Sequence, residues 1–157
     1  MLSETELQLI DNELRDAVTP RSACVEALLV VQRSRGWVSD EAMEEVATRL
    51  GMPLVELESI ATFYNLIFRQ PVGKHVIHVC DGISCWVTGG PKVSERVQAV
   101  LGIRPGETTS DGKFTLLPAD CMGVCDRAPA MIIDQTVYGP LSDTQVDEVI
   151  NNLENDR

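Results

Sequence analysis

The sequence CDGISC at residues 80–85 and the sequence CMGVC at residues 121–125 hold four of the five cysteines of this 157-residue chain. The members of the two pairs are separated by four and by three residues, and 35 residues separate the pairs. Each spacing lets a loop turn two sulfurs toward one point, which predicts a four-thiolate metal site built by two distant loops. Thiolate ligands select an iron–sulfur centre, zinc or, less often, copper.

Spacing alone leaves three interpretations of these cysteines open: an iron–sulfur centre, a structural zinc site and disulfides. Structural zinc loops usually separate paired cysteines by two residues, which neither pair does. The thioredoxin-type dithiol motif C-x-x-C is absent, so that redox activity is not predicted. An odd number of cysteines with ligand-like spacing argues against a secreted disulfide framework and for a reducing cytoplasm.

Small residues lie close to the cysteines in sequence, namely Gly82, Ser84, Gly89, Gly90 and Gly123. They allow the backbone to approach the sulfurs, so that N–H groups can form hydrogen bonds to a buried, negatively charged cluster. Ordinary turn chemistry explains the same glycines equally well.

The segments around the cysteines predict a small sheet with helices. Alternating β-branched residues predict a strand over 75–79 that ends on Cys80, and a second strand delivers Cys121 just beyond its end. The further elements are a helix over 91–101, the second strand over 114–117, a hairpin over 131–138 and a last helix opened by a Ser142–Gln145 capping box. The order β-α-β-β-β-α is that of a thioredoxin-like sheet.

The first part of the chain has helical periodicity instead. Four helices are predicted, the first opened by a Ser3–Glu6 capping box, the second begun at Ser22 and closed by Gly36, the third capped by Asp40 and closed by Gly51, and the fourth opened by Pro53. Cys24 lies inside the second helix without a cysteine neighbour, so we expect it to be a buried apolar residue. The predicted organisation is a helical bundle over 1–70 and an α/β domain over 71–157.

Charge and hydropathy narrow the classes of partner. The formal net charge is −11, and the acids are spread evenly, with 12 acids and 6 bases in residues 1–72 and 12 acids and 7 bases in residues 73–157. Nucleic acid and anionic lipid would repel such a chain, so we expect protein partners or small cofactors. The longest apolar run, residues 27–31, is far below the roughly 20 residues of a membrane helix. The N-terminus resembles no export signal, so the chain is expected to stay where it is made.

Three stretches carry a resemblance to a known family. They are QRSRGWVSDEAM (32–43), ATFYNLIFRQPVGKHVIHVCDGISCWVTGG (61–90) and LGIRPGETTSDGKFTLLPADCMGVCDRAPAMIID (101–134). They resemble the thioredoxin-like 2Fe-2S subunit of bacterial NADH:quinone oxidoreductase (respiratory complex I), from about Pro20 to the last helix. Trp86 after the second cysteine and Met122, where Leu is more usual, are at positions that commonly vary in this family.

The resemblance implies that Cys80, Cys85, Cys121 and Cys125 bind a single 2Fe-2S cluster, within a thioredoxin-like ferredoxin domain preceded by a small helical bundle. It also implies that the chain sits against the flavin-bearing, NADH-oxidising subunit and other iron–sulfur subunits, with FMN and NADH on the partner. The expected location is the cytoplasmic side of the bacterial inner membrane, without insertion into it. The same module occurs, by resemblance, in soluble NAD-linked formate dehydrogenases and hydrogenases.

The resemblance implies one-electron transfer, and the residues themselves predict no substrate chemistry in the isolated chain. No nucleophile is placed with a general base, and no Gly-rich nucleotide loop is present. His75 and His78 would be needed as ligands in a Rieske-like centre, but four cysteines already complete the ligand set, so both are interpreted as strand residues. A non-redox interaction module with a structural zinc is the alternative of another class. Three acids adjacent to cysteines are expected to lower the reduction potential: Asp81, Asp120 and Asp126.

Overall fold

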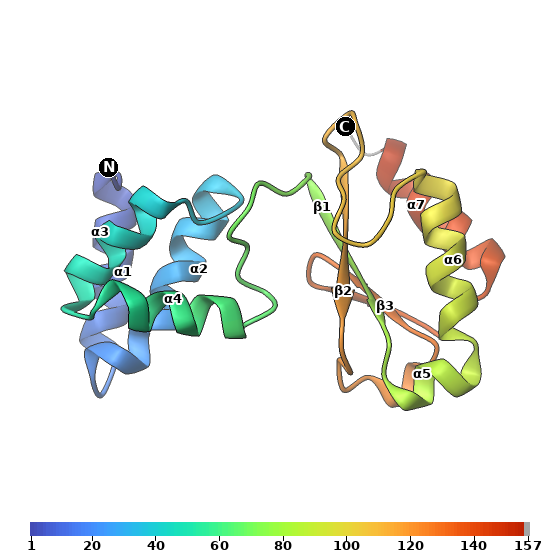
Figure 1. Ribbon diagram of the computed structural model, residues 1–157, viewed down its shortest axis with the longest axis horizontal. Coiled ribbons are helices and arrows are strands. Elements are labelled where there is room, and N and C mark those ends of the chain that lie inside the picture. Colours follow the sequence, from blue (N-terminus) through green and yellow to red (C-terminus); the bar gives the residue numbers. More distant parts are fainter. Residues whose placement is uncertain (156–157) are drawn as a thin grey trace. The chain divides into compact units, whose positions relative to one another are not determined.

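The computed structural model describes residues 1–155. The chain divides into two compact units, Met1–Pro71 and Val72–Arg157 (Figure 1). The first unit is entirely helical, and the second combines a sheet with helices. The four-cysteine stretch belongs to the second unit.

The helices of the first unit are α1 (Glu4–Asp16), the short 3-10 helix η1 (Pro20–Ala23), α2 (Cys24–Arg35), α3 (Asp40–Leu50) and α4 (Leu54–Phe63). The predicted Ser3–Glu6 capping box is confirmed, and Gly36 and Gly51 close their helices in left-handed conformations with φ of 84° and 65°. Two predicted starts are wrong by a residue or two. Ser39, and not Asp40, caps α3, because the Ser39 hydroxyl accepts the Ala42 N–H at 3.3 Å.

The predicted second helix begins at Cys24 and not at Ser22, because Thr19 and Ser22 cap the η1 turn instead. Cys24 is 5% exposed among the apolar core residues of this unit, which confirms its predicted role. A partly buried ion pair joins α1 and α2: the Arg35 guanidinium donates to the buried carboxylate of Glu6 and holds its pKa at about 2.

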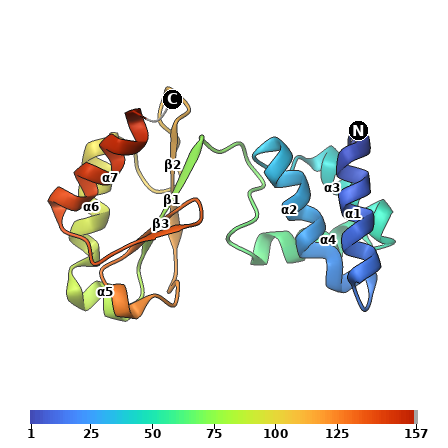
Figure 2. The same ribbon diagram turned by 180° about the vertical axis from the view of Figure 1, so that it is seen from behind.

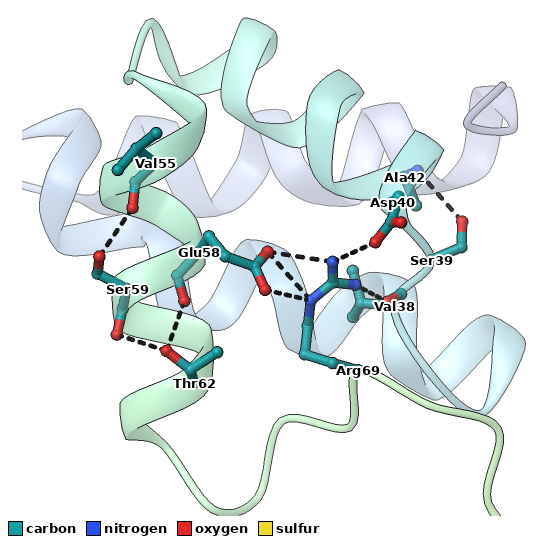
Figure 3. Close-up of polar contacts among 9 residues, drawn as sticks. All are labelled: Val38, Ser39, Asp40, Ala42, Val55, Glu58, Ser59, Thr62 and Arg69. Carbon is teal, nitrogen blue, oxygen red and sulfur yellow. Dashed lines mark hydrogen bonds and ion pairs between the residues drawn. The ribbon is translucent and has the colours of Figure 1, made fainter.

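The chain that follows α4 is held against the helices of the first unit by hydrogen bonds. Arg69 donates to the carbonyl oxygen of Val38, to Asp40 at 2.6 Å and to both carboxylate oxygens of Glu58 at 3.2 Å (Figure 3). The Gln32 side chain receives the Phe68 N–H at 2.6 Å. Because these bonds tie residues 68 and 69 to the helices, the first unit extends well beyond the last turn of α4.

The second unit is built on a four-stranded sheet in the order β2-β1-β3-β4. The strands are β1 (His75–Cys80), β2 (Phe114–Ala119), β3 (Met131–Ile133) and β4 (Thr136–Tyr138). Strands β1 and β2 are parallel, with Cys80 opposite Ala119, and the β3–β4 hairpin joins β1 in the antiparallel sense. The predicted strands and hairpin are confirmed.

Three helices complete this unit: α5 (Ile83–Thr88), α6 (Gly90–Leu101) and α7 (Asp143–Asn155). Figures 1 and 2 show α6 and α7 side by side over one face of the sheet, where they cover core residues such as Ile77, Phe114 and Met131. The Ser142–Gln145 capping box of α7 is confirmed by its two reciprocal bonds.

Helix α5 lies where the sequence predicts a loop, between Cys80 and residue 91. Six residues are too few for a visible helical period, and Ile83, Val87 and Thr88 are β-branched residues of modest helix propensity. So short a helix depends on tertiary contacts for its stability. The longest helices of residues 1–155 have 13 residues, and none of the described helices is long and apolar enough to cross a membrane.

Candidate metal centre

Two of the four cysteines are placed by the parallel pairing of β1 and β2. Cys80 is the last residue of β1, and Cys121 follows the end of β2 by two residues. The C-terminal ends of parallel neighbours lie at the same edge of a sheet. The Asp81 N–H donates to the Ala119 carbonyl at 3.2 Å, so the pairing continues just past Cys80. Both cysteines therefore leave the sheet at one edge, as the sequence predicts.

The other two cysteines lie on short helical segments at this edge. Cys85 is on α5, and Cys125 begins the 3-10 turn η2 (Cys125–Arg127). In Figures 1 and 2, α5 lies at the end of the sheet where β1 ends. The two pairs differ in exposure: the first pair, Cys80 and Cys85, is 4% and 1% exposed, whereas Cys121 and Cys125 are exposed.

Two glycines bring the cysteine-bearing segments into close contact. A Cβ atom at Gly82 would lie 3.0 Å from Cβ and 3.1 Å from Sγ of Cys121, and one at Gly90 would lie 2.9 Å from the carbonyl oxygen of Cys85. Gly82 has a φ of −66°, which any residue can adopt, so space and not backbone conformation requires glycine there. Gly89 and Gly123 have positive φ and serve as turn residues, as expected if ordinary turn chemistry explains them.

Backbone N–H groups are directed at the buried sulfurs. Burial by itself would raise the pKa of the Cys80 thiol, but N–H groups of Met122 and Gly82 and the thiol of Cys85 donate to its sulfur, so its pKa is lowered. Burial raises the pKa of Cys85, and its bond to Cys80 and the charge of Cys125 raise it further. Neither Met122 nor Ala130, whose N–H donates to Cys85, could be identified as a donor from the sequence.

The surroundings of Cys80 and Cys85 suit a cluster held by thiolates. Cys80 and Cys85 share a small apolar cluster with Ala130, Met122 is packed against it, and N–H donors offset negative charge on the sulfurs. Within residues 1–155, no group of three or more histidine, cysteine, aspartate or glutamate side chains is arranged to hold a single metal ion. The donor set of four soft sulfurs is that of iron–sulfur proteins, and zinc accepts the same donors.

The two histidines lie on β1 as predicted. Nδ1 of His75 is 2.8 Å from Oδ2 of Asp134, at the end of the strand away from the cysteines. His78 is 4% exposed inside the sheet, and burial lowers its pKa. Neither position adds to the four-sulfur set.

The acids next to the cysteines differ in their relation to the site. Asp81, Asp120 and Asp126 are all exposed. The charge of Asp81 acts on Cys80, whereas the Asp126 side chain is 81% exposed and lies 4.0 Å from Arg127. Asp81 is therefore better placed than Asp126 to influence the sulfurs.

A separate groove of about 430 Å³ lies in the first unit between α3 and α4. Its lining includes Met43, Leu54 and Val55 but no cysteine or histidine. Among its polar side chains, Arg69 forms ion pairs with both Asp40 and Glu58 (Figure 3). Among the described residues, no group that could hold a metal ion is found there.

Comparisons with known proteins show the family to which this chain belongs. The family model of the thioredoxin-like [2Fe-2S] ferredoxins matches residues 10–154. The E subunit of NADH-quinone oxidoreductase from Pseudomonas aeruginosa is 47% identical over 154 residues, covering 98% of this chain and 91% of the relative. The corresponding E subunit from Escherichia coli K12 is 44% identical over 149 residues, covering 95% and 90%. A crystal structure of an NAD+-reducing [NiFe]-hydrogenase in the H2-reduced state is similar with a TM-score of 0.70 and 25% identity, over 83% of this chain but only 22% of the hydrogenase chain.

The first prediction concerns the sulfur ligands. Replacing Cys80, Cys85, Cys121 or Cys125 by serine should cause loss or severe destabilisation of a bound cluster, because a hard alkoxide oxygen is a poor substitute for a thiolate on iron. Cys24→Ser is the matched control and should retain the cluster, since Cys24 lies in the core of the first unit. Iron and sulfide analysis with visible absorption spectra measures the outcome. Full iron and sulfide content with an unchanged spectrum in Cys121→Ser would remove that residue from the ligand set.

The second prediction concerns the close approach at Gly82. In Gly82→Ala, the new Cβ would lie 3.0 Å from Cβ and 3.1 Å from Sγ of Cys121, so the exposed cysteine segment must shift by a few tenths of an ångström. We expect a several-fold shorter half-life of the visible cluster absorbance in air, with an unchanged far-UV circular dichroism spectrum. Ser84→Ala is the control, because Ser84 lies on α5 two residues after Gly82 and is only partly buried. Equal half-lives for the two variants would show that this contact does not hold the site together.

Proposed function

Because this chain belongs to the thioredoxin-like [2Fe-2S] ferredoxin family, we propose that it is the electron-transfer subunit of a NADH-quinone oxidoreductase and carries one 2Fe-2S cluster. The proposal is supported by one observation. Four cysteines lie in the segments at and beyond the C-terminal ends of β1 and β2, in a chain that matches the NADH-quinone oxidoreductase relatives over nearly their whole length. A bound cluster supplies a one-electron carrier.

We propose Cys80, Cys85, Cys121 and Cys125 as the ligands. The protein's contribution is to hold the first pair away from water and to direct backbone N–H groups at its sulfurs. Such donors stabilise negative charge on a thiolate-bound cluster, and they influence the potential at which it accepts an electron. The second pair is exposed and provides the open side of the site.

The proposed partners are the subunit that binds FMN and NADH and the other iron–sulfur subunits of the same complex. Oxidation of NADH then takes place on the partner, and this chain accepts or stores one electron at a time. The proposed location is peripheral, on the cytoplasmic side of the bacterial inner membrane. Similarity to the NAD+-reducing hydrogenase supports a second candidate, the equivalent subunit of a soluble NAD-linked hydrogenase or formate dehydrogenase. The 44–47% identity to the NADH-quinone oxidoreductase relatives over nearly full length favours the respiratory complex.

Anaerobic purification tests the proposal. An iron–sulfur protein should be brown, with visible charge-transfer bands and equal iron and sulfide, and it should co-purify with a flavin-containing subunit that oxidises NADH. A colourless protein containing zinc would instead support the interaction module with a structural metal. Quinone reduction by the recovered complex separates the respiratory enzyme from a hydrogenase or formate dehydrogenase.

Asp81, Asp120 and Asp126 should lower the reduction potential of the cluster. A 2Fe-2S cluster with four thiolates carries about two negative charges when oxidised and about three when reduced, so a nearby carboxylate favours the oxidised form. At roughly 8 Å and an effective dielectric constant of about 40, one charge contributes on the order of 1 kcal/mol. For a one-electron couple this corresponds to roughly 40 mV.

Asp81→Asn should therefore raise the midpoint potential by tens of millivolts at low salt and by less at high salt. Asp120→Asn and Asp126→Asn should shift it in the same direction, with the smaller effect at Asp126 because that side chain is 81% exposed. Asp111→Asn is the control, since Asp111 precedes β2 at the opposite end of that strand. Potentiometric titration followed by EPR measures the shifts. Unshifted or lowered midpoints at low salt would rule out tuning by these acids.

A further inference from the structure

Asp134 has an uncommon backbone conformation for a residue with a side chain. It follows β3 in the short turn that leads to β4. Among residues 1–155, it is the one non-glycine residue with a positive φ, 56°. Glycine adopts this conformation freely, whereas residues with a Cβ atom are uncommon in it. Such an outlier points to a role of the side chain that compensates for the strain.

The Asp134 carboxylate contacts the start of β1 at two points, and we call these two contacts the Asp134 clamp. Oδ1 accepts the Val76 N–H at 2.9 Å, and Oδ2 lies 2.8 Å from Nδ1 of His75. The main-chain N–H of Asp134 also donates to the Val76 carbonyl at 2.9 Å. The His75 side chain is 12% exposed, and its ring lies 5.6 Å from the ring of Phe114 on β2. The turn after β3 is therefore fixed to β1 by its main chain and by its side chain.

The register of β3 on β1 decides which main-chain groups reach the first cysteine pair. Figures 1 and 2 show β3 beside β1, and because β3 has only three residues, three pairs set this register. One residue before β3, the Ala130 carbonyl accepts the Cys80 N–H at 3.1 Å, and the Ala130 N–H donates to the sulfur of Cys85. A slip of one residue would exchange the two faces of β3 and move this donor away from the sulfur.

We propose that Asp134 is a positioning residue for the candidate metal centre. Its carboxylate fixes the register of β3 on β1 and thereby holds the Ala130 N–H against the sulfur of Cys85. The inference rests on the proposed function, and it assigns a role in electron transfer to a residue at the opposite end of β1 from the cysteines. The hairpin needs such a contact, because two strands of three residues have little pairing of their own.

Two substitutions in the full-length, cluster-loaded chain separate the Asp134 clamp from the turn conformation. Asparagine and glycine both tolerate a positive φ, but only asparagine can still bond to the Val76 N–H and the His75 ring. Hydrogen-exchange mass spectrometry of the peptide that contains Cys80 should show exchange at least about tenfold faster in Asp134→Gly, because the Cys80 N–H is protected by its bond to Ala130. Asp134→Asn should exchange at nearly the rate of the unaltered chain.

The midpoint potential should follow the same order. Displacement of the Ala130 N–H leaves negative charge on the Cys85 sulfur less stabilised, which costs more in the reduced state, so Asp134→Gly should have a lower potential. Loss of a carboxylate charge alone would shift the potential upward instead. Asp111→Asn is the matched control for charge, because Asp111 also accepts a main-chain N–H in a turn at this end of the sheet, from Lys113, which leads into β2. It should not lower the potential.

A further variant tests the second contact of the Asp134 clamp. His75→Phe keeps an aromatic ring beside Phe114 and leaves the Val76 N–H bonded to Asp134, but it removes the bond to Oδ2. Its exchange rate and its potential should lie between those of Asp134→Asn and Asp134→Gly. Values equal to those of the unaltered chain would remove His75 from the clamp.

Two results would overturn the inference. Equal exchange rates in Asp134→Gly and Asp134→Asn would show that Asp134 serves only the turn conformation. Faster exchange in Asp134→Gly without a lower potential would show that the Asp134 clamp does not act on the sulfurs. A chain that holds no 2Fe-2S cluster would contradict the proposed function, whereas the exchange rates would still decide whether the clamp exists, so the two failures are distinguishable.

Discussion

The parallel pairing of β1 with β2 is the constraint on which the candidate metal centre depends. Because the two strands run in the same direction, with Cys80 opposite Ala119, the segments that leave them emerge at one edge of the sheet. An antiparallel pairing of the same two strands would send Cys80 and Cys121 to opposite ends, about six residues or roughly 20 Å apart. The helix α6 supplies the crossover that a parallel pair requires, and with α7 it covers the face of the sheet (Figure 1).

Close backbone packing then completes the site. Gly82 allows the Cys121 segment to pass within van der Waals contact, and Gly90 does the same for the carbonyl group of Cys85. The short distances that result let main-chain N–H groups reach the buried sulfurs. Burial of thiolates is unfavourable without such donors. The close packing around the first cysteine pair therefore also supplies the N–H groups that stabilise negative charge on its sulfurs.

The two cysteine pairs differ in exposure, so one side of the site is buried and the other faces solvent. The first pair lies in a small apolar cluster, whereas the second pair lies on an exposed segment bordered by carboxylates. Helix α5 belongs to both regions, because Cys85 is buried whereas Ile83 and Val87 of the same helix are exposed.

The sequence by itself determined the local features: the strand that ends on Cys80, the β3–β4 hairpin, the capping boxes at Ser3 and Ser142, and four cysteines in two spaced pairs. Each depends on residues close together in the chain, so propensity and spacing are sufficient to predict it. The resemblance of three long stretches to a known family then indicated the family of the chain. Only the tertiary structure decided that α5 is a helix, that Gly82 lies against Cys121 and that Met122 and Ala130 direct N–H groups at the sulfurs. These features depend on contacts between segments tens of residues apart, whose geometry is set by packing and leaves no periodic signal in the sequence.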